Sequence, residues 1–329
     1  MSFTEENKTI RNIGVLTSGG DAPGMNAAIR AVVRGGIQQG YRVYGIRRGY
    51  HGLWRGDIEE LNGRSVSETL QRGGTFLMTA RSKTFNSPAG VLKGIEMARV
   101  FNLDVIVTIG GDGTFRGARD LARQGFPVIG IPGTIDNDIG CSEYTIGYDT
   151  AMNTAMQCID KLRDTASSHE RCSVIEVMGR AAGYIALNVG IACGAEVVMI
   201  PEVKADFEQD VLKILLLGRN RGKSHYIVIV AEGTGDAAEI AHKIEAVTGI
   251  EARATILGHL QRGGSPSVRD RQMASMMGLH AIECIHDGRL NRIIAFRTGK
   301  IVDLDIEEAL SMTRTISATD LDRANTLVF

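Results

Sequence analysis

The sequence lacks an excess of either charge, aromatic side chains and long apolar runs. Its 37 basic and 38 acidic residues give a formal net charge of −1, so no global field favours nucleic acid or a membrane surface. Aromatic residues make up only 5% of the chain, which disfavours a base-stacking surface. No apolar run approaches the ~18 residues that span a bilayer, and residues 1–12 lack the apolar core of a signal peptide. We expect a soluble cytoplasmic protein that binds neither nucleic acid nor membranes.

Cysteine pairs and the common nucleotide motifs are also missing. The five cysteines form no Cys-x-x-Cys pair and are odd in number, so we expect reduced, largely buried thiols. Residues 222–224 (Gly-Lys-Ser) match the end of a Walker A loop, but position 217 is leucine where that loop needs glycine. No Gly-x-Gly-x-x-Gly follows a predicted strand, and no protein-kinase catalytic loop is present.

Glycine is abundant, and most of the 40 glycines stand at the ends of predicted strands. Short β-branched runs alternate with longer amphipathic stretches, a pattern typical of parallel sheets covered by helices. The pattern predicts strands at 13–17, 42–47, 105–109, 128–131, 173–177, 197–200, 226–231 and 252–257. It predicts helices at about 24–39, 88–101, 115–124, 147–166, 182–192, 207–217 and 237–247. We therefore expect an α/β protein of two similar lobes, each a largely parallel sheet covered by helices, with a seam near 138–147.

Two loops combine glycines with aspartates. Residues 110–114 (Gly-Gly-Asp-Gly-Thr) follow one apolar run, and 132–138 (Pro-Gly-Thr-Ile-Asp-Asn-Asp) follow the next. In an open parallel sheet both would lie at strand carboxyl ends, where ligands bind. Glycines let the backbone approach phosphates, and carboxylates hold magnesium or accept a proton. The combination predicts phosphoryl transfer, with capped turns built on these aspartates as the structural alternative.

Five motifs, in this order, resemble those of bacterial ATP-dependent 6-phosphofructokinases. They are residues 17–26 (TSGGDAPGMN), 110–113 (GGDG), 132–138 (PGTIDND), 176–180 (EVMGR) and 257–264 (LGHLQRGG). The resemblance implies transfer of the γ-phosphoryl of MgATP to the 1-hydroxyl of fructose 6-phosphate, giving fructose 1,6-bisphosphate and ADP, the committed step of glycolysis. It also implies a nucleotide-binding lobe (1–146 plus about 261–309) and a sugar-phosphate-binding lobe (147–260 plus about 310–329).

The resemblance also implies the site residues. Asp136 matches the catalytic base, Asp112 the magnesium-associated carboxylate, and Asp138 a second aspartate near the metal. The implied catalytic set is Thr134, Asp136, Asp138 and Arg180. The implied ATP-binding set is Gly20, Arg81, Ser82, Gly111, Asp112, Gly113 and Thr114. The implied substrate-binding set is Thr134, Ile135, Asp136, Arg171, Met178, Gly179, Arg180, Glu232, Arg253, His259 and Arg262.

Arginines suit a sugar phosphate because a guanidinium stays charged and binds a dianion through two hydrogen bonds. In the family, the positions of Arg171 and Arg253 reach a neighbouring subunit's active site. The resemblance therefore implies a homotetramer with dihedral symmetry, in which active sites are shared between subunits.

Two glycines bear on the phosphoryl donor. Pyrophosphate-dependent relatives tend to carry aspartate where this chain has Gly113 and lysine where it has Gly133, so ATP is the expected donor and pyrophosphate the alternative. An NAD kinase would share only the 110–113 loop and leave 132–138 and 259–264 without a use. A non-catalytic regulatory subunit is disfavoured because Asp112, Asp136 and Asp138 are all present.

The family also has an effector site between subunits, which binds ADP or phosphoenolpyruvate. The matching positions are Arg30, Arg34, Arg163, Glu196, Arg221, Lys223 and His225. The chain departs from the family pattern at Gly63, where an arginine is expected, and at Asn86, where another is expected near the adenine nucleotide. A one-residue insertion also falls between Ala205 and Arg221. We expect allosteric control, with its ligand and sign left open.

Overall fold

The computed structural model describes residues 10–82 and 84–326. The ends of the expected lobes, 1–9 and 327–329, lie outside the described residues. The chain divides into two compact units that each contain one sheet. Unit 1 comprises Met1–Thr134, Ile139–Ile146 and Ser265–Met312, and unit 2 comprises Ile135–Asp138, Gly147–Gly264 and Thr313–Phe329.

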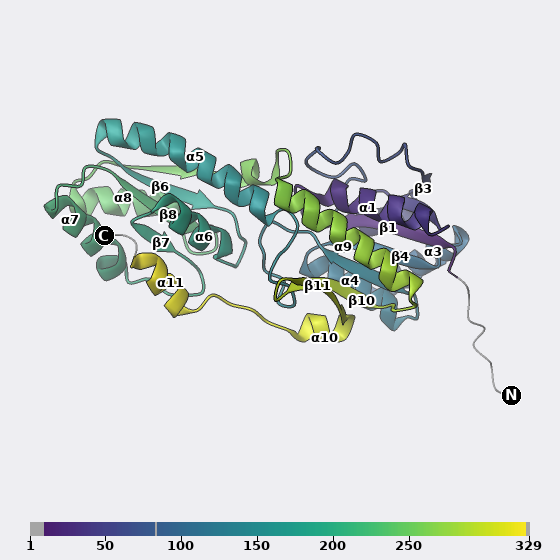
Figure 1. Ribbon diagram of the computed structural model, residues 1–329. Coiled ribbons are helices and arrows are strands. Elements are labelled where there is room, and N and C mark those ends of the chain that lie inside the picture. The colour runs from purple at the N-terminus through teal and green to yellow at the C-terminus, as the bar shows by residue number, and fades with distance from the viewer. Residues whose placement is uncertain (1–9, 83, 327–329) are drawn as a thin grey trace. The chain divides into compact units, whose positions relative to one another are not determined.

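The sheet of unit 1 is parallel at its centre and antiparallel at both edges (Figure 1). Its order is β11-β10-β5-β4-β1-β2-β3. The strands are β1 (Asn12–Ser18), β2 (Arg42–Ile46), β3 (Ile58–Leu61), β4 (Val105–Gly110), β5 (Val128–Pro132), β10 (Arg292–Arg297) and β11 (Lys300–Asp305). Ser18 pairs with Gly110, and Gly110 pairs with Pro132, so the carboxyl ends of β1, β4 and β5 lie in line.

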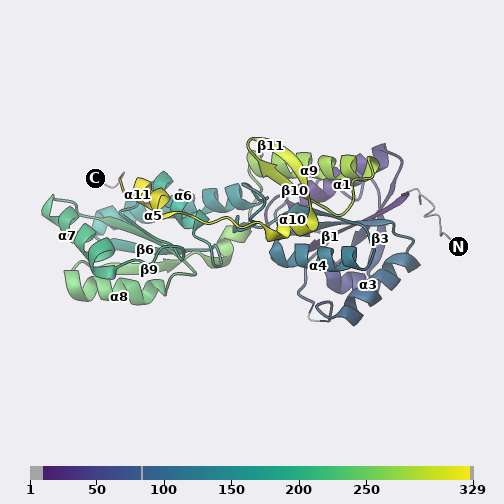
Figure 2. The same cartoon turned by 90° about the horizontal axis from the view of Figure 1, so that it is seen from below.

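Helices cover both faces of this sheet (Figure 2). On one face α1 (Met25–Gln38) and α9 (Val268–His286) lie side by side. Their approach depends on small residues, because a Cβ added at Gly278 would lie only 2.7 Å from Ala31 Cβ. The helices on the other face share one apolar core with the sheet; they are α2 (Gly49–Arg55), α3 (Pro88–Val100), α4 (Asp112–Arg123) and α10 (Ile306–Ser311).

Unit 2 contains an all-parallel sheet in the order β7-β8-β6-β9. The strands are β6 (Cys172–Val177), β7 (Val197–Met199), β8 (Tyr226–Ala231) and β9 (Ala252–Ile256). One face is covered by α5 (Tyr148–His169), α6 (Tyr184–Cys193) and α11 (Ala318–Asn325) (Figure 2). The other is covered by the π-helical turn η1 (Phe207–Leu212), α7 (Lys213–Asn220) and α8 (Ala237–Thr248). A 3-10 helix, η2 (Gly258–Arg262), follows β9.

The α/β class and the two helix-covered sheets are confirmed, with differences at particular elements. The helix expected at 115–124 begins at Asp112, because Gly111 takes the N-cap position, and this places the Asp112 carboxylate in the first turn. The helix expected at 207–217 begins as a π-helical turn, whose first amides are capped by the Asp206 carboxylate. All five cysteines are free thiols, and three of them are buried. None of the described helices combines the length and the apolarity needed to cross a membrane.

Candidate active site

Unit 1 brings three loops together at the carboxyl ends of β1, β4 and β5. The Thr114 hydroxyl donates to the Ser18 carbonyl at 2.9 Å, and the Gly133 amide donates to the Gly110 carbonyl at 3.0 Å. At the end of the third loop, the Thr134 carbonyl accepts the Thr145 hydroxyl at 2.6 Å. These bonds join the turn at Gly19 and Gly20, residues 110–114 and residues 132–134 into one surface, at the sheet edge where the sequence predicts a phosphate site.

The glycines of these loops are not equivalent. A Cβ at Gly110 would overlap the Ser18 carbonyl oxygen and the Thr114 side chain, so only glycine fits where β1 and β4 meet α4. A Cβ at Gly133 would lie 3.0 Å from Ile109 Cγ2, which is also crowded. At Gly113, none of the described residues lies within 4 Å of an added Cβ. Packing therefore does not require glycine at 113, and the position opens onto free space beside the loops.

Asp112 has the chemistry and the placement of a magnesium ligand. It starts α4, where the first backbone N–H groups lack intrahelical partners and the helix dipole favours anions. Arg116 Nε donates to Asp112 Oδ2 at 2.8 Å, while Oδ1 has no such partner among the described residues. Carboxylate oxygen is a preferred ligand of Mg²⁺, so this partly exposed group fits the ion.

The segment that carries Arg81 and Ser82 lies beside the turn after β1. The Thr79 hydroxyl donates to the Gly19 carbonyl at 2.7 Å, and the Thr17 hydroxyl donates to the Met78 carbonyl at 3.0 Å. Arg81 is exposed two residues further on. The Ser82 hydroxyl accepts the Phe85 amide at 3.2 Å, so this serine also caps a local turn.

In unit 2, expected sugar-phosphate residues gather at the carboxyl ends of the strands. Met178, Gly179 and Arg180 follow β6, and Glu232 follows β8. The Glu232 carboxylate accepts the backbone N–H groups of Gly179 and Arg180, which orients the glutamate and fixes the turn. Buried Gln261 accepts the Met178 amide at 2.8 Å and so attaches η2 to the end of β6. No motif argument identified this role of Gln261.

A hollow in unit 2 lies against η2 and the end of β9. His259, expected in the substrate site, lines it, and Arg262 ends the same short helix. Its lining residues are Thr154, Ile256, Leu257, His259, Leu260, Gly263 and Gly264.

The loop of the two aspartates that are expected to be catalytic, Ile135–Asp138, packs within unit 2, although it was expected in the nucleotide-binding lobe. Asp136 is buried, with 6% of its surface exposed. Asn137 has a left-handed backbone, with φ of 52°. Arg180 Nη1 lies 4.0 Å from Asp138 Oδ2, so the structure brings these two expected catalytic residues together. Arg314, which the sequence analysis did not single out, donates from Nη2 to the Asn137 carbonyl.

Arg171 and Arg253 lie at the other edge of the same sheet. Arg171 immediately precedes β6, and Arg253 is the second residue of β9. Both contact the Glu251 carboxylate, at 2.8 Å and 2.6 Å, and the hydrogen bond from Arg171 contributes most to lowering the pKa of Glu251. Six strand residues at ~3.3 Å each separate Arg171 from Met178, a length of about 20 Å. Arg253 pairs with Ser173 near the start of β6, so both arginines lie towards the amino edge of the sheet and share Glu251 there.

Three of the expected effector residues form contacts near the amino ends of β7 and β8. Lys223 pairs with Glu196, which is 2% exposed and also accepts the Ile227 amide at 2.6 Å. Arg163, on α5, donates to the Cys193 carbonyl three residues before Glu196. The remaining members are Arg221 and His225, which flank Lys223 in sequence, and Arg30 and Arg34, which lie on α1 of unit 1.

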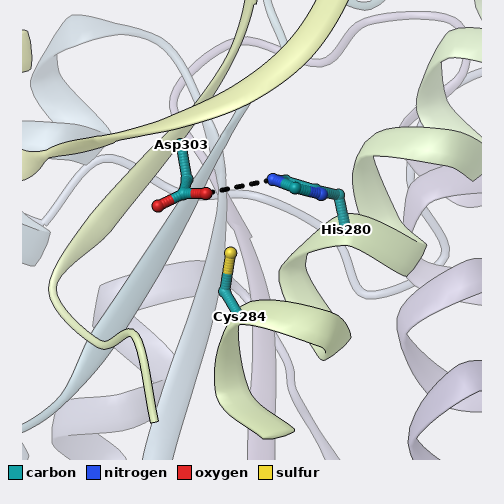
Figure 3. Close-up of side chains that lie close together, drawn as sticks. All are labelled: His280, Cys284 and Asp303. Carbon is teal, nitrogen blue, oxygen red and sulfur yellow. Dashed lines mark hydrogen bonds and ion pairs between the residues drawn. The ribbon is translucent and has the colours of Figure 1, made fainter. Parts of the chain in front are cut away.

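Another cluster in unit 1 has the residue types of a metal site (Figure 3). His280, Cys284 and Asp303 offer ligand atoms within 4.8 Å of one another. The Asp303 carboxylate already accepts hydrogen bonds from Arg289, Arg292 and His280. Burial alone would raise the pKa of Asp303, but the bonds from Arg292 and Arg289 lower it to about 2. Burial also raises the pKa of the Cys284 thiol to about 12. The guanidinium groups of Arg289 and Arg292 already neutralise the Asp303 carboxylate and bond to its oxygens. The cluster therefore does not fit a metal ion.

Comparison with known proteins identifies the family. A phosphofructokinase family model matches residues 12–285. The ATP-dependent 6-phosphofructokinase of Clostridium acetobutylicum is 54% identical over 97% of this chain and 99% of its own. A phosphofructokinase structure from Saccharomyces cerevisiae matches with a TM-score of 0.86 and 31% identity over 97% of this chain, which spans 48% of that longer chain. A pyrophosphate-dependent phosphofructokinase structure from Marinobacter aquaeolei, at 21% identity and a TM-score of 0.83, covers 97% of this chain and 92% of its own and shows the fold alone. The chain belongs to the phosphofructokinase family.

Proposed function

We propose that this chain is an ATP-dependent 6-phosphofructokinase, which phosphorylates fructose 6-phosphate at its 1-hydroxyl and releases ADP. The 54% identity to an enzyme of that name, over 97% of the chain, carries the proposal. The geometry supports it separately within each unit. Unit 1 presents glycine loops and a helix N-terminus suited to phosphates, and unit 2 presents carboxylates and arginines suited to a phosphorylated sugar.

The free space at Gly113 supports ATP as the phosphoryl donor. An aspartate there would project into that space and place negative charge beside the phosphate-binding loops. Glycine leaves the space for the extra phosphate of ATP. The 54% identity to an ATP-dependent enzyme, against 21% to a pyrophosphate-dependent one, points the same way.

In unit 1 the chain holds and polarises the donor. Backbone N–H groups of Gly20, Gly111 and Gly113 face phosphate oxygens, and Arg81 adds a positive charge. Ser82 and Thr114 complete this set, with the Thr114 hydroxyl already committed to holding the loops together. Asp112 would hold Mg²⁺, and the bound ion would neutralise phosphate charge.

In unit 2 the chain holds the acceptor and removes its proton. Asp136 takes the proton of the 1-hydroxyl, so the oxygen attacks the γ-phosphorus as the bond to ADP breaks. The positive charge of Arg180 stabilises the transferring phosphoryl group, and Asp138 lies beside Arg180. The Glu232 carboxylate is oriented by two backbone amides and accepts hydrogen bonds from sugar hydroxyl groups. The other contacts to the sugar phosphate come from Ile135, Met178, Gly179, His259 and Arg262 of unit 2 and from Thr134, the last residue of its segment of unit 1.

Arg171 and Arg253 act on a neighbouring subunit. Their place supports this assignment: about 20 Å of strand separates Arg171 from the carboxyl edge of the unit 2 sheet, and Arg253 shares its partner Glu251 at the amino edge. The working unit is then a cytoplasmic homotetramer with shared active sites. ADP or phosphoenolpyruvate binds at the effector residues, where the Glu196–Lys223 pair would meet the ligand.

The decisive experiment compares donors in parallel assays. The purified protein is incubated with Mg²⁺ and fructose 6-phosphate, with either ATP or pyrophosphate, and fructose 1,6-bisphosphate is measured. Product with ATP alone supports the proposal. Product with pyrophosphate overturns the donor assignment, and no product with either donor favours a regulatory subunit.

A further inference from the structure

The loop that carries Asp136 and Asp138 adopts a backbone that needs support from outside itself. Its central residue, Asn137, has φ of 52°. Asparagine adopts this left-handed conformation more readily than most residues with a side chain, and contacts around the residue hold it there. Because Asn137 joins the two aspartates, the contacts that hold its peptide also set the directions of both carboxylates.

Two contacts within unit 2 hold this residue. Arg314 Nη2 donates to the Asn137 carbonyl oxygen. The Asn137 side chain hydrogen-bonds the Tyr148 hydroxyl and so lowers the pKa of that phenol, although burial dominates and raises it. The loop is therefore fixed through its main chain by Arg314 and through its central side chain by α5.

Arg314 is itself held on an aromatic platform. Its Cζ lies 4.4 Å from the centre of the Tyr184 ring, a cation–π arrangement. Burial raises the pKa of Tyr184, and the charge of Arg314 opposes that rise. The Tyr148 hydroxyl donates to the Tyr184 carbonyl at 3.0 Å, and Asn188 Nδ2 donates to the same hydroxyl at 2.9 Å. A planar guanidinium can stack on a ring and still donate at its edge, which an ammonium group cannot do in the same way.

The position of Arg314 in the chain makes this contact specific. It lies in the segment between α10 and α11, drawn in yellow in Figure 1, near the C-terminal end and outside all five motifs. Arg314 is the second residue of the stretch that returns to unit 2 at Thr313. The C-terminal segment therefore bonds to the Asp136–Asp138 loop at the second residue after it re-enters unit 2.

We propose that Arg314 is a positioning residue for phosphoryl transfer. Stacked on Tyr184 and bonded to the carbonyl between the two aspartates, it holds the loop so that Asp136 meets the sugar hydroxyl. The proposal rests on the proposed function, in which Asp136 is the base. Arg314 acts on kcat rather than on substrate affinity, since it bonds to the loop's backbone and to an aromatic ring.

The first test replaces Arg314 by methionine and by lysine, with Arg323→Met as a matched control at an exposed arginine of α11. Arg314→Met should lower kcat by up to about 100-fold, the effect of a small misplacement of a reacting group. The KM values for ATP and fructose 6-phosphate should stay within a few-fold of wild type. Arg314→Lys should have a kcat between those of Arg314→Met and wild type. Tyr184→Phe, which keeps the aromatic face, should retain a higher kcat than Tyr184→Leu.

A double-mutant cycle separates this proposal from the assignment of the base. Asp136→Asn alone should lower kcat by about 10²–10⁴-fold. If Arg314 acts through Asp136, adding Arg314→Met to Asp136→Asn should lower kcat little further. Near-normal kcat in Asp136→Asn would overturn the base and leave the Arg314 single variants to be judged alone. A kcat within twofold of wild type in Arg314→Met, or fully additive losses in the double variant, would overturn the positioning role.

Thermal unfolding measured on each variant distinguishes positioning from folding. The proposal expects Arg314→Met to remain folded at the assay temperature while kcat falls. A fall in kcat that only follows the fraction of unfolded protein would count against positioning, as would a rise in KM with kcat unchanged.

Discussion

Arg171 and Arg180 stand at opposite ends of β6, with the six residues of the strand and a two-residue turn between them. One faces the amino edge of the unit 2 sheet and shares Glu251 with Arg253, whereas the other lies near Asp138 at the carboxyl edge. The two arginines therefore lie at opposite edges of one sheet, and mixed oligomers can test the proposal that they serve the active sites of different subunits.

Hybrid complementation should restore activity. If Arg171 and Arg253 bind the sugar phosphate of a neighbouring subunit, as proposed, replacing both by alanine removes charged hydrogen bonds, and kcat/KM for fructose 6-phosphate should fall about 10- to 100-fold or more. Mixing this variant with Asp136→Asn, after dissociation and reassembly, should give activity above the sum of the two parents. Hybrids that form, as shown by a charge tag, but stay inactive would contradict sharing of sites.

Gly113 and Gly110 should respond differently to substitution. Gly113→Ala should leave thermal stability unchanged because the site is open, and Gly113→Asp should lower kcat/KM for ATP through charge beside the phosphates. Gly110→Ala should destabilise the fold by about 1–3 kcal/mol, because its Cβ meets the Ser18 carbonyl. Thermal melts and ATP titrations measure both effects. Equal ATP kinetics in Gly113→Asp and Gly113→Ala would remove the donor argument.

Asp303 should make stability depend on pH at the acid end. Its folded-state pKa of about 2 lies below the ordinary value of 3.8, so the unfolded chain binds the proton more readily. Asp303 therefore contributes about 2 kcal/mol to the free energy of unfolding. This contribution is complete above pH 4 and is lost as the pH falls through 2. Asp303→Asn should remove this loss, whereas Asp287→Asn at an exposed ion pair should not. Denaturant unfolding across this range is the measurement, and added Zn²⁺ should raise the melting temperature of neither protein.

Arg163 should be needed for the response to effectors. Its guanidinium holds the Cys193 carbonyl just before Glu196, so Arg163→Ala should bring the ratio of activities with and without ADP, or phosphoenolpyruvate, towards one. Arg219→Ala is a matched control, since that arginine also donates to a backbone carbonyl, that of Thr248, at 2.8 Å. Identical effector responses in Arg163→Ala and wild type would move the effector site elsewhere.

The sequence allowed the central strands and the loops that follow them to be predicted, because their signal is local. Strands β4 and β8 are continuous apolar runs, buried along their whole length, and a glycine-rich or acidic turn ends each one. Strands β3, β10 and β11 were not predicted; the edge strands β3 and β11 are partly exposed and mix charged with apolar residues. Helix α9 was also missed; its contact with α1 depends on small residues such as Gly278, which leave little apolar periodicity.

Within the site, the family resemblance named the expected residues but not the hydrogen bonds and contacts between them. Asp112 was placed in a loop because glycines flank it, whereas Gly111 serves as the N-cap of a helix that begins at the aspartate. The support of Asn137 by Arg314 joins residues 177 positions apart, and no pattern along the chain reports such a contact.

The discontinuity of the two units also sets an order of events during synthesis. The sheet of unit 2 is complete once β9 has emerged at Ile256, with all four strands drawn from one stretch of chain. The sheet of unit 1 starts at Asn12 but receives β10 and β11 only with residues 292–305. A domain folds as a unit once its chain is available. On the ribosome, the sheet that begins first is therefore the last to close, and β5 keeps an open edge until the residues of β10, Arg292–Arg297, have been made.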